Sequence, residues 1–314
     1  MHIASPLSVE IERKFCKNIA EKDGCDSDGL KASTGADALR SLDAAGIGRG
    51  ALLSTAYMIG SPEVAEPPNL LAPETRAENA YVVEQARLSC DRLAAFISVN
   101  PNSPNALDEI RYWARTGGAT GLKLHLANSG FDFNSPAQMA NLGAVFEAAN
   151  EARFPIVVHL RNRDPNYGGK AVEQFLNQIL PRARGVTVQI AHAGGWGGVD
   201  AQTLSALSAF AEAIGSDPAG TRNLLFDLAY VPDLPDRKAS LSDDQALAGL
   251  MRRIGLQRFL PASDWIKGMD LTQYYSSEVP ALPLTPDEWR EVLSNEAPYM
   301  RRLDSGCSLN AKTQ

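Results

Sequence analysis

Long apolar runs are missing from this 314-residue sequence. No stretch approaches the roughly 18 apolar residues that cross a bilayer, and the N-terminus has no basic segment followed by an apolar core of the kind that directs secretion. Hydrophobic residues make up 44% of the chain and are spread along it, which suits a large buried core. We therefore expect a folded, cytoplasmic protein with no membrane partner.

A surplus of positive charge is also missing. The chain has 30 Lys and Arg residues against 37 Asp and Glu residues, so its formal net charge is -7 at pH 7. No cluster of basic residues alternates with aromatic residues. Because proteins that bind nucleic acids use such clusters to neutralise phosphates, we expect no nucleic-acid partner.

Cysteine is scarce and scattered. Cys16, Cys25, Cys90 and Cys307 show neither the CxxC spacing of metal and redox sites nor the density of a small disulfide-stabilised domain. This usage favours free thiols in a reducing compartment.

A nucleotide-binding glycine motif is absent as well. The stretch 194–198 is rich in glycine, but Asp200 stands where the third glycine of GxGxxG would fall when the motif is counted from Gly195, and no Walker-type lysine follows. A doubly wound open sheet, which binds nucleotides through such motifs, is therefore the less favoured architecture.

The sequence does contain a regular alternation of short runs rich in Val, Ile and Leu with longer segments of helical periodicity. Counting an edge strand near 1–5, about eight such units are present, which is the number that closes a barrel. We predict an α/β fold, a (β/α)8 TIM barrel, as a single domain over 1–314 with an irregular opening at 1–35 and a tail at 304–314. The other expected strands are 50–57, 95–99, 120–126, 155–160, 186–191, 224–229 and 258–261.

Only four histidines are present, and three of them, His125, His159 and His192, each end one of these predicted strands. A fourth run is followed by Asp264. A single histidine at a strand end is more often a hydrogen-bonded structural residue, and a single aspartate is usually a helix cap. The whole set at one end of a barrel instead favours an active site, because neutral imidazoles and a carboxylate are what a catalytic Zn²⁺ site requires.

The alternation of side chains along a strand predicts where these residues point. Alternate residues of a strand share a face, so Lys123 and His125 point into the barrel together. By the same reasoning His159, His192 and Asp264 converge at one end of the barrel, close enough to share an ion, and His125 lines the cavity beside them.

These segments carry a family resemblance. Gly121-Leu-Lys-Leu-His125, Pro155-Ile-Val-Val-His159, Ile190-Ala-His192-Ala-Gly-Gly, Phe226-Asp-Leu and Ala262-Ser-Asp264-Trp, in this order, resemble the amidohydrolase-related metal-dependent enzymes of the amidohydrolase 2 branch. The likeness covers roughly residues 36 to 303. It implies that His159 and Asp264 are metal ligands, that Asp264 also accepts protons, and that His192 activates water or assists proton transfer.

The first strand departs from the family pattern. The family opens with two ligands in an HxH or ExH pair, whereas this chain begins Met1-His2-Ile3. His2 fits the second ligand of that pair and is predicted to bind the metal. A chain that starts too late, or one that has lost a ligand, would explain the missing first position, and the alternative is that His2 is a disordered terminal residue.

Other side chains near the strand ends suggest the substrate. Arg161 follows His159 and would grip a carboxylate, although arginines after strands are commonly surface charges. Trp196 would wall an apolar or aromatic pocket, although it would equally serve loop packing. We predict that His125, Arg161 and Trp196 bind a small carboxylate substrate, while Lys123 is a buried structural or substrate-orienting charge.

The expected function is a metal-dependent hydrolase that cleaves a C–O or C–N bond of a small anionic substrate, such as a lactone or an amide. A divalent ion, Zn²⁺ first and Mn²⁺ second, would activate water while His192 and Asp264 handle protons. Two alternatives stay open: non-oxidative decarboxylation of an aromatic or muconate-like acid, which the same branch also performs, and a non-catalytic barrel with a degraded metal site. A homo-oligomer is expected as well.

Overall fold

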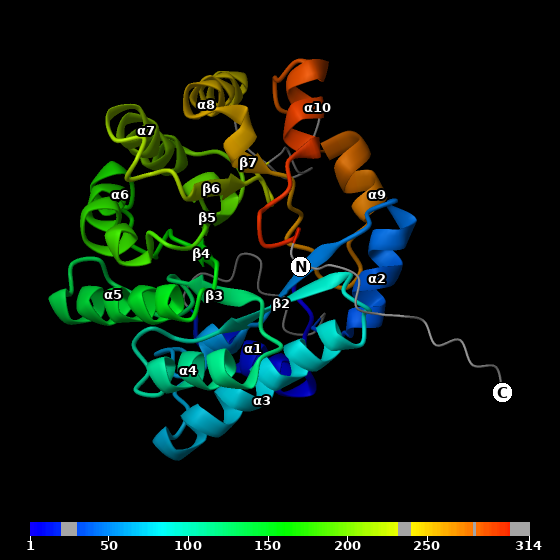
Figure 1. The fold of residues 1–314 in the computed structure, drawn as a ribbon, viewed down its shortest axis with the longest axis vertical. Helices are drawn as coiled ribbons and strands as arrows, with labels where there is room; N and C mark the ends of the chain where they lie inside the picture. Colours follow the sequence, from blue (N-terminus) through cyan, green and yellow to red (C-terminus); the bar gives the residue numbers. More distant parts are fainter. Residues whose placement is uncertain (20–29, 232–239, 279–280, 302–314) are drawn as a thin grey trace.

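The centre of the protein is a parallel sheet of seven strands arranged in chain order. The computed structural model describes residues 1–19, 30–231, 240–278 and 281–301. Figure 1 shows the strands following one another around the middle of the molecule with the helices outside them. The strands are β1 (Gly50–Leu53), β2 (Leu93–Ser98), β3 (Gly121–His125), β4 (Ile156–His159), β5 (Val188–Ile190), β6 (Leu224–Asp227) and β7 (Phe259–Leu260).

Helices surround the strands (Figure 1). They are α1 (Pro6–Asn18), α2 (Gly35–Ala44), α3 (Pro68–Arg87), α4 (Ala106–Thr116), α5 (Pro136–Glu151), α6 (Gly169–Gln174), α7 (Ala201–Ser216), α8 (Leu241–Ile254), α9 (Leu271–Gln273) and α10 (Pro286–Ser294). On β3, the fully buried Leu122 and Leu124 belong to the core shared with the helices, whereas Lys123 lines an interior cavity. The alternation predicted for this strand is therefore present.

The register of neighbouring strands brings polar residues level with one another. His125 on β3 is paired with His159 on β4. One layer deeper, Lys123 is paired with Val157, and Val157 with Gln189 on β5. Because parallel strands present their carboxyl ends at the same edge of the sheet, this register delivers side chains from successive strands to one rim.

The eighth strand is reduced to a short N-terminal contact. The backbone N–H of Leu53 donates to the carbonyl of Met1 over 2.9 Å, and the N–H of His2 donates to the carbonyl of Trp265 over 2.7 Å. An isolated parallel bridge joins His2 to Leu53. The prediction of an α/β fold with consecutive parallel strands is thus confirmed, but the complete (β/α)8 barrel is not, since seven strands are formed in the described residues.

The opening of the chain differs from the prediction. Residues 1–35 were expected to be irregular, yet Pro6–Asn18 form α1, for which Ser5 is the N-cap and accepts a hydrogen bond from the N–H of Ser8 over 3.0 Å. Ile11 and Phe15, four residues apart, pack on the segment after β1. The irregular-opening prediction missed this spacing and was wrong there. Residues 20–29 and the predicted tail 304–314 lie outside the described residues.

The cysteine prediction also needs correction. Cys16 and Cys90 are both disulfide-bonded, so the expectation of free thiols is wrong for these two residues. Cys25 and Cys307 lie outside the described residues. The argument from cysteine usage for a reducing compartment is therefore removed. Separately, none of the helices in the described ranges has the length and apolar character needed to span a membrane.

Candidate active site

The side chains of interest come from the carboxyl ends of the strands. His125 and His159 are the last residues of β3 and β4, and His192 follows β5 by two residues. Asp227 is the last residue of β6, and Asp264 comes four residues after the end of β7.

Two of the imidazoles lie against each other. The rings of His125 and His159 stack with centroids 3.9 Å apart and an interplanar angle of 9°, and His192 lies 5.0 Å from His159 between centroids. Burial lowers the pKa of His125 and of His159 well below the usual histidine value, and the neighbouring positive charges lower it further. Both rings are therefore neutral at pH 7, which is the form that binds metals.

Asp264 lies between two histidines. Its Oδ1 is 3.2 Å from Nε2 of His2, and its Oδ2 is 3.9 Å from Nε2 of His192. Burial raises the pKa of Asp264, but the charge and hydrogen bond of His2, followed by His192 and Lys123, outweigh this and hold the pKa well below its ordinary value. The carboxylate is consequently ionised and able to accept protons. Its backbone φ is 51°, a left-handed conformation that aspartate tolerates better than most residues.

The ring orientation of His192 is set by hydrogen bonding. Its Nδ1 lies 2.6 Å from the carbonyl oxygen of Ala229. A carbonyl only accepts hydrogen bonds, so Nδ1 carries the proton in the neutral ring. Nε2 is then the unprotonated nitrogen, and it is the one that lies towards Asp264. This arrangement makes Nε2 of His192 a base at the rim of the sheet.

The donor types fit a divalent ion. Both ring nitrogens of His159 and Nδ1 of His2 are buried and have no hydrogen-bond partner among the described residues, and a buried polar atom is normally paired. Imidazole nitrogens together with the Asp264 carboxylate are suitable ligands for Zn²⁺ or Mn²⁺.

The positions of these donors do not form a finished coordination shell. Across the described parts of the chain, no group of three or more His, Cys, Asp or Glu side chains is placed to hold a metal ion. The prediction that His159, His192 and Asp264 stand close enough to share one is therefore not met. The ring of His159 instead lies against His125 and against Trp196, whose ring centroid is 5.2 Å away.

An aromatic wall borders the histidines. Trp196 meets His159 and His125 edge-on at 5.2 and 6.4 Å, and Tyr57 lies 5.0 Å from His125.

The Arg161 guanidinium is 5.9 Å from the Trp196 ring. Its terminal nitrogens are held within the protein: Nη1 donates to Asp200 over 2.8 Å, and Nη2 donates to Gln202. Arg161 thus adds positive charge beside the wall, but its terminal nitrogens already have protein partners.

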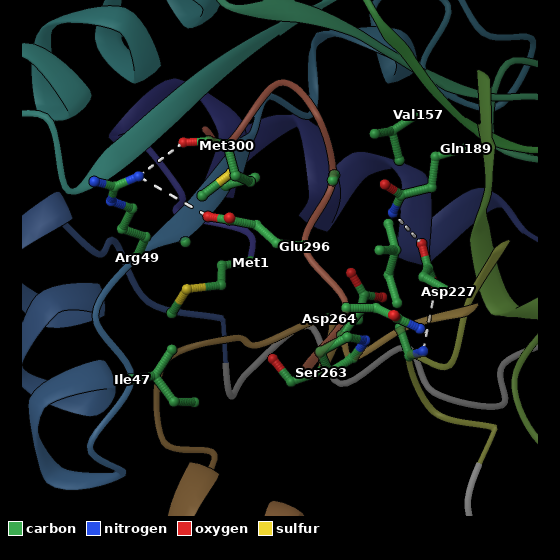
Figure 2. Close-up of a pocket in the computed structure, with 18 of the residues that line it drawn as sticks. Met1, Ile47, Arg49, Val157, Gln189, Asp227, Ser263, Asp264, Glu296 and Met300 are labelled. Carbon is green, nitrogen blue, oxygen red and sulfur yellow. Dashed lines mark hydrogen bonds and ion pairs between the residues drawn. The ribbon is translucent and has the colours of Figure 1, made fainter. Parts of the chain in front are cut away.

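A cavity of about 680 Å³ reaches from this rim into the interior. His192, Asp264, Asp227 and Lys123 line it, whereas His2, His159 and Trp196 do not. Figure 2 shows Arg49 on one side of the cavity and Gln189 and Asp227 on the opposite side.

Lys123, which lines this cavity, is 2% exposed. Burial lowers its pKa, while Asp264 and Asp227 partly offset this.

Sequence reasoning assigned no role to three residues at the site. Gln189 shares the inward parity of Lys123 and Val157, and Asp227 ends its strand as the histidines do, so the strand-end signal that identified the histidines applied to Asp227 as well. Tyr57 follows β1, at the end of a longer predicted run, where the chain makes a short helical turn.

A parallel α/β sheet with histidines and an aspartate at the carboxyl ends of its strands is the architecture of metal-dependent barrel hydrolases and lyases. A family model described as amidohydrolase, the amidohydrolase 2 family, matches residues 31–294. The chain belongs to this family and is an enzyme of it, as its residues suggested.

Solved structures share the fold at low sequence identity. The 5-carboxyvanillate decarboxylase of Sphingomonas paucimobilis has a TM-score of 0.61 at 14% identity, with 96% of each chain covered. A dihydroxybenzoic acid decarboxylase from a Polaromonas species, solved with bound manganese and 2-nitroresorcinol, has a TM-score of 0.58 at 13% identity, covering 96% of this chain and 94% of that one. A putative 2-pyrone-4,6-dicarboxylic acid hydrolase from Pseudomonas putida has a TM-score of 0.51 at 17% identity, covering 96% and 94%. No curated protein sequence matches the chain.

Proposed function

We propose that this enzyme is a metal-dependent, non-oxidative decarboxylase of a small aromatic carboxylic acid. The observation that carries the proposal is the ionised Asp264 between His2 and His192, next to an aromatic wall that includes His159 and Trp196. The wall offers a surface for a planar ring. Two of the solved structures that share the fold are decarboxylases of aromatic acids, which is consistent with this choice.

His2, His159 and Asp264 would hold a divalent ion, Zn²⁺ or Mn²⁺, which when bound polarises a substrate oxygen. In the reaction the bond from the ring carbon to the carboxylate breaks, the electron pair stays on the carbon, and CO₂ leaves. The carbon then takes a proton. His192 would pass that proton from solvent through Nε2, which lies towards Asp264. His125 and Trp196 would pack against the aromatic ring of the substrate.

The reaction type is tested with 2,6-dihydroxybenzoate and 5-carboxyvanillate as probes, in H₂¹⁸O, with a 2-pyrone-4,6-dicarboxylate lactone in parallel. We expect one CO₂ released per aromatic acid consumed and no solvent ¹⁸O in the aromatic product. Ring opening of the lactone with one ¹⁸O incorporated, and no CO₂ from either acid, would exclude decarboxylation.

Hydrolysis remains the second candidate because the same two groups suit it. The ionised Asp264 and the unprotonated Nε2 of His192, 3.9 Å apart, are placed to accept a proton from an attacking water. The ¹⁸O experiment separates the two reactions because only hydrolysis adds solvent oxygen to the product.

We predict that activity depends on a bound metal ion, and a matched pair of variants tests whether His159 holds it. Chelation is expected to reduce activity by at least about 100-fold, since the ion supplies several kcal/mol of charge stabilisation, and Zn²⁺ or Mn²⁺ should restore it. His159→Ala should lose bound metal in elemental analysis. His125→Ala, which removes the ring stacked on His159, should keep it. Equal metal content in both variants, or activity that survives chelation, contradicts the assignment of His159.

A further inference from the structure

A buried chain of polar groups extends from the His192 backbone into the interior of the sheet. Oδ1 of Asp227 accepts hydrogen bonds from the backbone N–H of His192 over 2.9 Å and of Ala229 over 3.2 Å. Oδ2 accepts from Nε2 of Gln189 over 2.6 Å. The Tyr299 hydroxyl in turn donates to Oε1 of Gln189 over 2.5 Å. Asp227, Gln189 and Tyr299 are 3, 6 and 7% exposed.

The two backbone N–H groups that Asp227 binds belong to the two residues whose contact sets the orientation of the His192 ring. One belongs to His192 itself, and the other belongs to Ala229, whose carbonyl accepts from Nδ1 of His192 over 2.6 Å. Oδ1 of Asp227 therefore binds the backbone of both His192 and Ala229, the two residues whose contact selects the tautomer of the His192 ring. Figure 2 shows Asp227 with its bonds to Gln189 and to the His192 backbone.

The backbone at His192 needs such support. His192 and Ala193 have φ of 54° and 51°, a left-handed conformation that is unfavourable for a residue with a side chain. Without a partner for the His192 N–H, the segment would lose the hydrogen bond that stabilises this conformation. A buried N–H without a partner is also unfavourable, because it has given up its hydrogen bonds to water without replacing them. The ring would then be free to leave the Ala229 carbonyl.

We propose that Asp227 is a positioning residue that keeps the His192 imidazole in the Nδ1-protonated tautomer with Nε2 open, and that Gln189 and Tyr299 hold Asp227 in place for this task. The inference rests on the proposed function only in giving His192 a role in proton transfer. The donors around Asp227 are two backbone N–H groups and one amide, so the carboxylate is oriented by neutral groups that have fixed positions in the sheet.

The chemistry of the network distinguishes two substitutions. In Asp227→Asn, the side-chain oxygen can still accept from His192 and Ala229, and the new amide can donate to Gln189 if the Gln189 amide turns over. In Asp227→Ala, no acceptor remains for either N–H. The asparagine variant should therefore preserve the His192 tautomer, and the alanine variant should lose it.

The test uses ¹⁵N-histidine NMR on the Zn²⁺-loaded full chain, whose four imidazoles give few signals; His192→Asn identifies the His192 resonances by their loss. We expect a protonated Nδ1 and an unprotonated Nε2 in the wild type and in Asp227→Asn, and a mixture of tautomers in Asp227→Ala. In turnover, Asp227→Ala should lower kcat by about 100-fold with KM within about twofold, because proton transfer by a positioned side chain contributes about 10²–10⁴-fold. Asp227→Asn should retain most of the activity.

Asp217→Ala is the matched control, since Asp217 accepts a backbone N–H from Gly220 over 2.9 Å beyond the end of α7. It should change neither the tautomer nor kcat. If Asp227→Ala does not fold, Gln189→Ala, which removes the amide donor to Asp227 and the acceptor for Tyr299, should show a partial mixture of tautomers. An unchanged His192 tautomer in folded Asp227→Ala, or in Gln189→Ala where Asp227→Ala does not fold, overturns the inference. The NMR readout needs no turnover, so a wild type that fails to release CO₂ counts against the proposed function alone.

Discussion

Replacing Asp264 with asparagine is expected to lower kcat by about a thousandfold while the protein stays folded. Acid–base catalysis by a positioned group contributes about 10²–10⁴-fold, and Asp264 is the ionised carboxylate that faces both His2 and His192. Asparagine has nearly the same shape but cannot accept a proton or carry the negative charge that holds these imidazoles. The loss should persist at saturating Zn²⁺, because it includes the proton-transfer role as well as metal binding.

The comparison is with Asp108→Asn, which changes an exposed carboxylate whose side chain is 83% exposed on α4. This control should keep wild-type kcat. Thermal unfolding of both variants checks that the fold is intact. Activity of Asp264→Asn within about tenfold of the wild type would show that Asp264 does not handle the proton, and would remove the central support for the proposed chemistry.

The regular part of the fold was predictable because its physical signals are local. Buried strands of a parallel sheet read as apolar runs, and the helix at 286–294 begins at a capping box with Thr285 as N-cap and Pro286 at its first turn. The α1 helix was missed although Ser5 and Pro6 form a comparable start, because its polar residues obscured the spacing of Ile11 and Phe15. The closure of the sheet was overestimated, since one bridge at His2 reads in sequence like a full edge strand.

In the candidate site, too, the features that depend on local sequence were predictable and those that depend on tertiary contacts were not. Parity placed His125, His159 and Lys123 on the inward face, because the alternation of side chains in a strand is strict. It could not determine how far each side chain reaches, so the stacking of His159 on His125 was not foreseen. Nor could sequence show that Arg161 is held by Asp200, 39 residues away, or that Asp227 holds the His192 backbone. These contacts depend on tertiary neighbours.

A second cluster of carboxylates leads to a prediction about stability. Glu78 of α3 is 1% exposed and accepts a hydrogen bond from the Ser5 hydroxyl. Ser8 donates to Glu12 over 3.1 Å, and its hydroxyl is 2.7 Å from that of Thr55. Burial raises the pKa of Glu78 from 4.5 to about 7 and that of Glu12 likewise to about 7. No cation is bonded to either carboxylate within the described residues, so their protonated forms are favoured in the folded protein.

The direction of the pH dependence follows from proton uptake. Between pH 4.5 and 7 the folded protein holds protons on Glu78 and Glu12 that the unfolded chain has released. Stability from these groups is therefore greatest at acid pH and is lost as pH rises through the folded pKa. Each pKa unit corresponds to about 1.4 kcal/mol, so Glu78 alone accounts for about 3 kcal/mol. His125 and His159, whose pKa values are lowered by burial, act in the opposite direction, because they lose stability as pH falls below 6.5.

The variant Glu78→Gln separates these contributions, because the histidines are common to it and to the wild type and cancel in the difference. Glutamine keeps an acceptor for Ser5 but cannot ionise. Urea unfolding at pH 5 and pH 8 should show the free energy of unfolding of Glu78→Gln rising relative to the wild type by about 3 kcal/mol from the lower pH to the higher. Glu151→Gln, at the exposed end of α5, should show no such change. A difference that stays constant with pH would mean that Glu78 ionises normally in the folded protein, and that the contact between Ser5 and Glu78 does not depend on a protonated carboxyl.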